Sequence, residues 1–226
     1  MSHHDKFRTV MTAQTSPFWQ PAIWQQQLAK SIRTLDELLT ELELHQDQVP
    51  DALKQFKSFP LRVTRSYVSR MRKGDPDDPL LRQILPITQE SFKSAGYSLD
   101  PVGDLDAMPE SGLLHKYKGR ALLVTTGACA IHCRYCFRRH FPYNDHLAPS
   151  NEWQTAIDYI ESDTSLSEII LSGGDPLSLS DERLHILTEK LACIPHVKTL
   201  RIHTRLPIAL PERIDDHFIK WISGIT

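Results

Sequence analysis

The sequence predicts an α/β fold: a partial (β/α) barrel of about three β/α units, preceded by a helical N-terminal region. Apolar residues recur at helical spacing before residue 110, and short β-rich runs alternate with helical segments after residue 120. We therefore divide the 226 residues into a helical region, 1–110, and the N-terminal part of the barrel, 111–226. A closed eight-stranded barrel takes about 250 residues. We expect the C-terminal part of the barrel to be missing from this chain.

The N-terminal region contains three predicted helices. Thr34 and Glu37 fit a capping box, and four leucines then follow at helical spacing, which predicts a helix over 35–42. A second helix is expected over 66–73, stopped by Gly74 and Pro76, and a third over 79–85, ended by a proline. Residues 98–112 are rich in proline and glycine and predict a linker.

Strands and helices alternate in the remainder of the chain. Apolar, β-rich runs predict strands over 121–126, 168–171 and 198–202. Helices are expected over 152–161, 181–192 and 212–222. This order implies a parallel sheet with helices packed on it.

The composition is that of an ordinary globular protein, with 40% hydrophobic and 24% charged residues. The net charge of −2 gives no electrostatic argument for binding nucleic acid or an anionic membrane. No apolar run approaches the roughly 20 residues of a membrane span, and the N-terminus has no signal-peptide core. We expect a cytoplasmic protein without a nucleic-acid or membrane partner.

Three of the four cysteines lie within eight positions, directly after the first predicted strand. Cys129, Cys133 and Cys136 have the spacing C-x3-C-x2-C, which suits three thiolates around a 4Fe-4S cluster with one iron left open. Clustered cysteines in a cytosolic chain indicate metal or redox chemistry rather than disulfides. We expect the fourth, Cys193, to be a buried core thiol.

Zinc is the alternative ligand for the cysteine cluster. A structural zinc site needs a fourth ligand, which His132 or His140 could supply. Arginines also alternate with aromatic residues over 134–141, as they do on stacking platforms for bases. A zinc-knuckle RNA-binding module therefore stays open as a second interpretation.

The cysteine spacing, with Tyr135 before the third cysteine, resembles the signature of the radical S-adenosylmethionine superfamily. That resemblance implies reductive cleavage of S-adenosylmethionine to a 5′-deoxyadenosyl radical. The segment 171–176, with glycines at 173 and 174, follows the second strand; glycines allow close approach of a ligand, and Asp175 could accept hydrogen bonds from an ammonium or cap a helix. The contacts that the resemblance implies for S-adenosylmethionine are Tyr135, Ser172, Gly173, Gly174, Asp175, His203 and Arg205.

A narrower resemblance covers residues 62–214. The Gly-Gly-Asp form of the second motif and the runs over 115–120, 136–141 and 201–214 are similar to the lysine 2,3-aminomutase family. The resemblance implies that Tyr117 packs near pyridoxal phosphate, that Arg120 binds its phosphate and that Arg138 holds the substrate carboxylate. Lys116 stands where the family usually has arginine. The runs over 74–82 and 133–143 resemble the branch that serves β-lysylation of elongation factor P.

The resemblance implies conversion of (S)-α-lysine to (R)-β-lysine, with free lysine as the substrate. The implied cofactors are a 4Fe-4S cluster, S-adenosylmethionine and pyridoxal phosphate. The implied partners are elongation factor P with its ligase and an electron donor of flavodoxin or ferredoxin type. None of Lys190, Lys198 and Lys220 matches the context of the family's cofactor lysine, so we assign no catalytic residue. A radical S-adenosylmethionine enzyme without pyridoxal phosphate is the remaining alternative.

Overall fold

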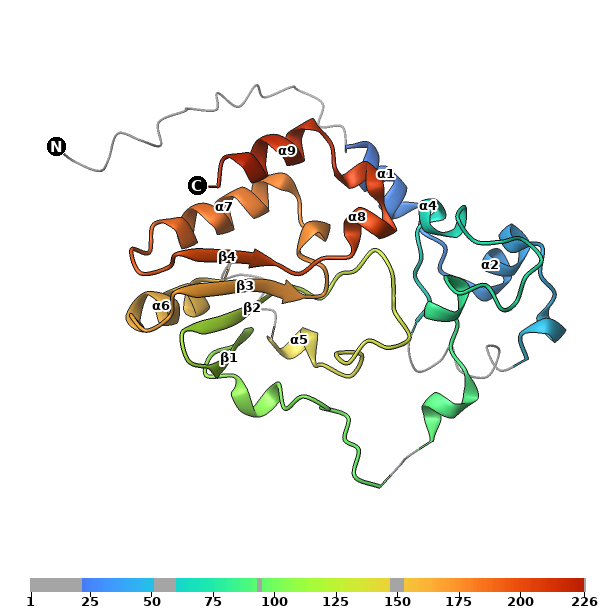
Figure 1. Cartoon of the computed structure of the whole chain (residues 1–226), viewed down its shortest axis with the longest axis horizontal. Helices are drawn as coiled ribbons and strands as arrows, with labels where there is room; N and C mark the ends of the chain where they lie inside the picture. The colour runs from blue at the N-terminus through green and yellow to red at the C-terminus, as the bar shows by residue number, and fades with distance from the viewer. Residues whose placement is uncertain (1–21, 51–59, 93–94, 147–152, 226) are drawn as a thin grey trace.

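A four-stranded sheet lies at the centre of the computed structural model, which describes residues 22–50, 60–92, 95–146 and 153–225. The strands are β1 (Leu113–Tyr117), β2 (Arg120–Thr126), β3 (Glu168–Gly173) and β4 (Thr199–Ile202), in the order β1-β2-β3-β4. The last three run parallel, as predicted. Their carboxyl ends point toward the N-terminal part of the chain (Figure 1).

Two helices cover the sheet where the sequence predicts them. They are α6 (Gln154–Ser162) and α7 (Asp181–Ala192), and the predicted start of the first, at residue 152, lies outside the described residues. Ile157 and Ile160 of α6 and Leu187 and Leu191 of α7 pack with the buried side chains of β2 and β3. Burial of these apolar faces is the main stabilising term for such a layered unit.

Strand β1 was not predicted. The sheet is therefore not all-parallel, and the linker leads into β1 rather than directly into the first parallel strand. It pairs antiparallel with β2, with Leu113 opposite Leu123 and Tyr117 opposite Arg120. The turn between them passes through Gly119 at φ 82°, a conformation that favours glycine. This strand has no clear apolar pattern, because only Leu113 and Leu114 are buried in it.

The N-terminal segment contains short helices. These are α1 (Ile23–Ala29), α2 (Leu35–Leu42) and α4 (Arg65–Val68), with 3-10 turns η2 (Gln46–Gln48), η3 (Leu81–Gln83), η4 (Thr88–Ser91) and η5 (Leu105–Ala107). Thr34 caps α2 by accepting from the Glu37 N–H at 3.3 Å, as predicted. The helices expected over 66–73 and 79–85 are each only one turn long. The first is α4, which ends at residue 68, and a 3-10 turn, η3, stands where the second was expected. Side chains of Ser69 and Arg70 bond back to the Ser66 carbonyl and so compete with a continuing helix.

The chain beyond β4 packs back onto the N-terminal segment. It forms α8 (Leu206–Ala209), η7 (Pro211–Arg213) and α9 (Asp216–Ser223), so the last predicted helix begins at 216 rather than 212. One hydrophobic cluster joins Trp24, Leu38 and Leu81 with Leu206 and Trp221. The N-terminal segment and the sheet unit therefore share a core.

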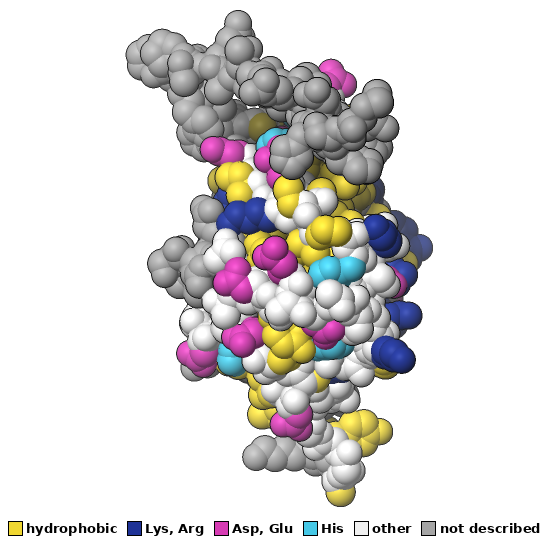
Figure 2. Space-filling view, turned by 90° about the vertical axis from the view of Figure 1, so that its left-hand side faces the viewer, with side chains coloured by type: hydrophobic (Ala, Val, Ile, Leu, Met, Phe, Trp, Pro, Cys, Tyr) yellow, Lys and Arg dark blue, Asp and Glu magenta, His cyan; other side chains and the backbone are white. Residues whose placement is uncertain are grey.

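On the face that Figure 2 shows, acidic and histidine side chains are scattered among apolar and other residues, and most Lys and Arg side chains lie along the right-hand edge. In the described ranges, no helix has the length and hydropathy that a membrane crossing requires.

Candidate functional site

The loop that carries the three cysteines follows the carboxyl end of β2 and leads to α5 (Tyr143–His146). It reaches across to the N-terminal segment (Figure 1), where the His132 N–H donates to the Arg62 carbonyl at 2.9 Å and the Arg134 N–H donates to the Gln83 carbonyl at 2.8 Å. Cys129, Cys133 and Cys136 are free and partly buried. In parallel α/β folds this edge of the sheet is where ligand sites form.

Gly173 and Gly174 bring the end of β3 against the start of the cysteine loop. A Cβ on Gly174 would lie 2.4 Å from the Ala128 carbonyl oxygen, and one on Gly173 would lie 2.7 Å from Val124 Cγ1. Two backbone hydrogen bonds close this contact, from the Gly174 N–H to the Thr126 oxygen at 2.6 Å and from the Asp175 N–H to the Ala128 oxygen at 2.7 Å. The sequence predicted close approach to a ligand; the close approach in the structure is to the loop that presents the cysteines.

Alanine at Gly174 should therefore disturb the cysteine loop. We expect Gly174→Ala to lower the free energy of unfolding by about 1–3 kcal/mol, the usual cost of forcing an extra methyl into a packed site. Iron loading after reconstitution should fall with it. Gly224→Ala is the matched control, since its Cβ would meet nothing nearer than 3.4 Å. Equal stability and equal loading in the two variants would contradict the packing role of Gly174.

Asp175 forms internal hydrogen bonds with its carboxylate. It accepts from Thr204 Oγ1 at 2.6 Å, from the Arg205 N–H at 2.8 Å and from the Leu177 N–H at 3.1 Å, the last of which caps η6 (Pro176–Ser178). Burial raises the pKa of the Asp175 carboxyl, against the effect of these three donors. The bond from the Leu177 N–H confirms the helix-capping alternative for one contact of Asp175. The role of Asp175 toward S-adenosylmethionine stays a prediction.

The three thiols are close enough to influence one another. Burial raises the pKa of the Cys129 thiol to about 12, and Asp175, Cys136 and Cys133 add to that shift. Burial also raises the pKa of the Cys133 thiol, while Arg205, whose Nη1 lies 2.6 Å from Sγ, acts in the opposite direction. A metal that binds thiolates must displace these protons.

The donor set fits an iron–sulfur cluster. Three unpaired thiols lie on a single loop, and a charged arginine beside one of them favours the thiolate that iron binds. Within the described ranges, no three His, Cys, Asp or Glu side chains are grouped so as to hold a metal ion. In a 4Fe-4S cluster each cysteine binds a different iron, so the sulfur atoms need not share one ion.

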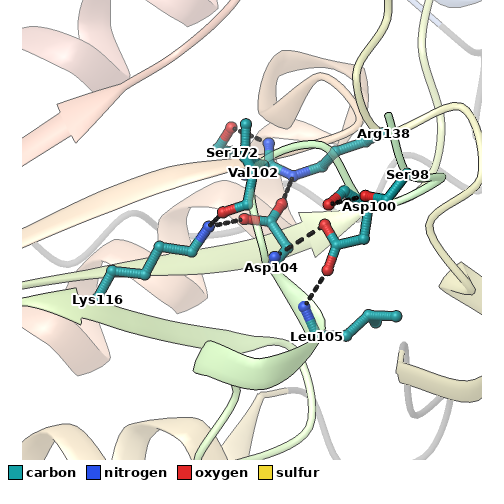
Figure 3. Close-up of polar contacts among 8 residues, drawn as sticks. All are labelled: Ser98, Asp100, Val102, Asp104, Leu105, Lys116, Arg138 and Ser172. Atoms are coloured by element: carbon teal, nitrogen blue, oxygen red, sulfur yellow. Dashed lines mark hydrogen bonds and ion pairs between the residues drawn. The ribbon is translucent and has the colours of Figure 1, made fainter. Parts of the chain in front are cut away.

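Arg138 forms an ion pair with Asp104 that the sequence did not predict, and its guanidinium also lies beside Ser172 (Figure 3). Its Nε donates to Asp104 Oδ2 at 2.8 Å, and its Nη1 donates to Ser172 Oγ at 3.3 Å. Asp104 also accepts from Lys116 Nζ at 2.5 Å, so one buried carboxylate lies between two cations. Asp100 fixes the loop by accepting from the backbone N–H groups of Asp104 and Leu105. Asp104 thus links Lys116 of β1 to Arg138 of the cysteine loop.

The two residues expected to bind pyridoxal phosphate lie elsewhere. Tyr117 and Arg120 flank the turn between β1 and β2, at the opposite end of β2 from the cysteine loop, about 20 Å away by the rise of a strand. Tyr117 is exposed, and Arg120 Nε lies 3.9 Å from Glu168 Oε2. The structure does not bring these two residues to the cysteines, and their role stays a prediction.

The remaining predicted residues surround the loop. Tyr135 is exposed and its hydroxyl lies 3.4 Å from Gln83 Oε1, while His203 is exposed at the end of β4, where its N–H donates to the Leu171 carbonyl. Cys193 is also exposed, so the expectation of a buried core thiol was wrong; it is the C-cap residue of α7 and lies outside the buried face that Leu184, Leu187 and Leu191 form.

The arginines of the cysteine run are paired with acids. Arg134 and Arg139 both contact Glu90, at 2.5 Å and 2.9 Å, and Arg138 pairs with Asp104. Guanidinium groups held in this way have less freedom to bind phosphates. The arrangement weakens the RNA-binding alternative.

Comparison with known proteins adds to this geometry. Residues 118–200, which include the three cysteines and the Gly-Gly-Asp turn, match the family described as a 4Fe-4S single cluster domain. The chain is 46% identical over 204 residues to an L-lysine 2,3-aminomutase of Escherichia coli K12. It is 41% identical over 200 residues to that of Haemophilus influenzae and 44% identical over 206 residues to that of Buchnera aphidicola.

Over most of its length the chain is similar to the lysine 2,3-aminomutase family. The three alignments cover 90%, 88% and 88% of this chain, and each covers 59% of the relative. The chain thus spans about three fifths of the length of these relatives. The match to a 4Fe-4S single cluster domain and the similarity to these relatives favour the iron–sulfur interpretation of the cysteines over the zinc-knuckle alternative.

Proposed function

We propose that this chain carries the cluster-binding and S-adenosylmethionine-binding part of a radical lysine 2,3-aminomutase, built on a partial (β/α) barrel. The reaction is the isomerisation of (S)-α-lysine to (R)-β-lysine. The observation that supports it most is the loop holding Cys129, Cys133 and Cys136 at the carboxyl edge of the sheet, packed against the Gly-Gly-Asp turn, in a chain 46% identical to a lysine 2,3-aminomutase.

The bound cofactors supply the difficult chemistry. When bound, a 4Fe-4S cluster would supply the electron for reductive cleavage of S-adenosylmethionine, and pyridoxal phosphate would supply a ring that stabilises a radical. Cys129, Cys133 and Cys136 would hold the cluster, and the partial burial of their loop would limit the access of water to it. The backbone turn at 173–175 orients that loop.

Arg138 is the residue that we assign to the lysine carboxylate. Asp104 engages its Nε and Ser172 its Nη1, whereas Nη2 forms no hydrogen bond with any described residue and is the nitrogen that we assign to the carboxylate. The product serves β-lysylation of elongation factor P by a separate ligase, and a flavodoxin or ferredoxin supplies the electrons. These partners follow from the resemblance of the motifs alone.

The test is reductive cleavage by the reconstituted chain. The chain is loaded with iron and sulfide without oxygen and reduced with dithionite. We expect it to release methionine and 5′-deoxyadenosine in equal amounts from S-adenosylmethionine, measured by mass spectrometry. The same chain with Cys136→Ser should release neither. Absence of 5′-deoxyadenosine from a chain with a full cluster would contradict the proposal.

Lysine labelled with deuterium at C3 tests the substrate. With pyridoxal phosphate and this lysine present, we expect deuterium to enter 5′-deoxyadenosine. Unlabelled 5′-deoxyadenosine formed at the same rate with and without pyridoxal phosphate would favour the alternative, a radical enzyme that does not use this cofactor.

A further inference from the structure

Arg205 links the end of β4 to one of the cluster cysteines. Its Nη1 donates to Cys133 Sγ at 2.6 Å, and its backbone N–H donates to Asp175 Oδ2 at 2.8 Å. The contact spans 72 positions of the sequence, so it depends on the fold rather than on the cysteine motif. The resemblance assigned this arginine to S-adenosylmethionine and gave it no part in holding the cluster.

Gln83 fixes the orientation of this guanidinium. Its Oε1 accepts from Arg205 Nη2 at 2.8 Å and also lies 3.3 Å from the Tyr67 hydroxyl. Its backbone carbonyl accepts from the Arg134 N–H, which ties η3 to the cysteine loop. The Tyr135 ring adds a further contact, with its centroid 5.4 Å from the guanidinium carbon. Arg205 is thus held from several sides with one nitrogen directed at the sulfur.

A fixed positive charge at a cluster thiolate favours the reduced cluster. Reduction adds one electron, and so one negative charge, to the cluster and its sulfur ligands. The attraction between that charge and the guanidinium is stronger in a partly buried site than in water. Arginine keeps its charge at every accessible pH, and hydrogen bonds to cluster sulfurs are among the factors that set reduction potentials.

We propose that Arg205 raises the reduction potential of the cluster through its hydrogen bond to Cys133, and that Gln83 is the positioning residue that holds Arg205 there. The inference rests on the proposed function in one respect: a 4Fe-4S cluster must bind the three cysteines. In this proposal the N-terminal segment, through Gln83, helps to set how readily the cluster accepts an electron.

The test is a redox titration of the reconstituted chain without S-adenosylmethionine or lysine. Dithionite with mediators supplies the electron, and the EPR signal of the reduced cluster is followed against potential. At the midpoint potential of the unsubstituted chain, we expect Arg205→Gln to lower the ratio of reduced to oxidised cluster about tenfold, a shift of about 59 mV for one electron. Arg205→Lys keeps the charge, so we expect its midpoint potential to lie between those of Arg205→Gln and the unsubstituted chain.

Arg201→Gln is the matched control. It removes the same charge from β4, but Arg201 Nη2 pairs with Glu168 at 2.7 Å rather than with a cysteine. We expect its midpoint to equal that of the unsubstituted chain. Gln83→Met, which leaves the guanidinium in place without its partner, should shift the midpoint in the same direction as Arg205→Gln but by less.

The outcomes separate this inference from the proposed function. Equal midpoints for the unsubstituted chain, Arg205→Gln and Arg201→Gln, all with full clusters, would overturn the inference and leave the cluster assignment intact. If Arg205→Gln loads no cluster, an unchanged midpoint in Gln83→Met would overturn it instead. An unsubstituted chain that binds no cluster would overturn both. If Arg205 served only to bind S-adenosylmethionine, the titration without that ligand would show no shift.

Discussion

Asp104→Asn should destabilise the chain by about 3–5 kcal/mol, the usual cost of removing one partner of a buried ion pair. Asp104 is 3% exposed and lies between Arg138 and Lys116, so the uncharged amide would leave two cations close together without a counter-charge. The measurement is urea unfolding followed by circular dichroism. The largest part of the effect comes from Arg138, whose side chain is 8% exposed.

Two further variants show whether charge is the cause. Asp106→Asn, an exposed position two residues away, should change the free energy of unfolding by less than about 0.5 kcal/mol. Adding Lys116→Met to Asp104→Asn should recover part of the loss, because only one unpaired cation then remains. An Asp104→Asn variant as stable as Asp106→Asn would show that the ion pair contributes little to the fold.

Cys136→Ser should prevent assembly of the cluster. Serine is a poor ligand for iron compared with a thiolate, and a cluster that already has an open iron has no spare cysteine. We expect about four iron and four sulfide ions per unsubstituted chain after reconstitution, and close to none in the variant. Colorimetric iron and sulfide assays give both numbers.

Cys193→Ser provides the matched control, since Cys193 is exposed and lies at the end of α7, outside the cysteine loop. Its loading should equal that of the unsubstituted chain. Full loading of Cys136→Ser, or loss of iron from Cys193→Ser, would show that the cysteines were assigned wrongly. Stoichiometric zinc in place of iron would instead support a structural metal site.

The parallel part of the fold could be predicted because its signals are local. Runs such as Ile169–Leu171 are continuously apolar and buried on both sides, and α7 has leucines at helical spacing between Ser180, which caps it, and Ala192. Strand β1 lacks such a signal, since its second half is partly exposed. The helix predicted over 35–42 has the observed bounds of α2, but the helix expected over 66–73 is too long because helical spacing does not reveal side-chain bonds that end a helix, such as those of Ser69 and Arg70.

The candidate site was also predictable only where its signals are local in the sequence. The spacing of the cysteines indicates a cluster without any knowledge of the fold. Gln83 lies 122 positions from Arg205 and Asp104 lies 34 positions from Arg138, so neither contact leaves a pattern in the sequence. Sequence also cannot tell which partner a glycine approaches. Gly174 proved to pack against Ala128, in the backbone of the cysteine loop.

The most direct test of the central claim, an open iron that binds S-adenosylmethionine, is the EPR spectrum of the reduced, reconstituted chain with and without that ligand. We predict that S-adenosylmethionine changes the g-values of the reduced cluster. Methylthioadenosine, which lacks the amino and carboxylate groups that would chelate the iron, should leave them unchanged. A fully loaded cluster with the same spectrum in all three samples would contradict the account.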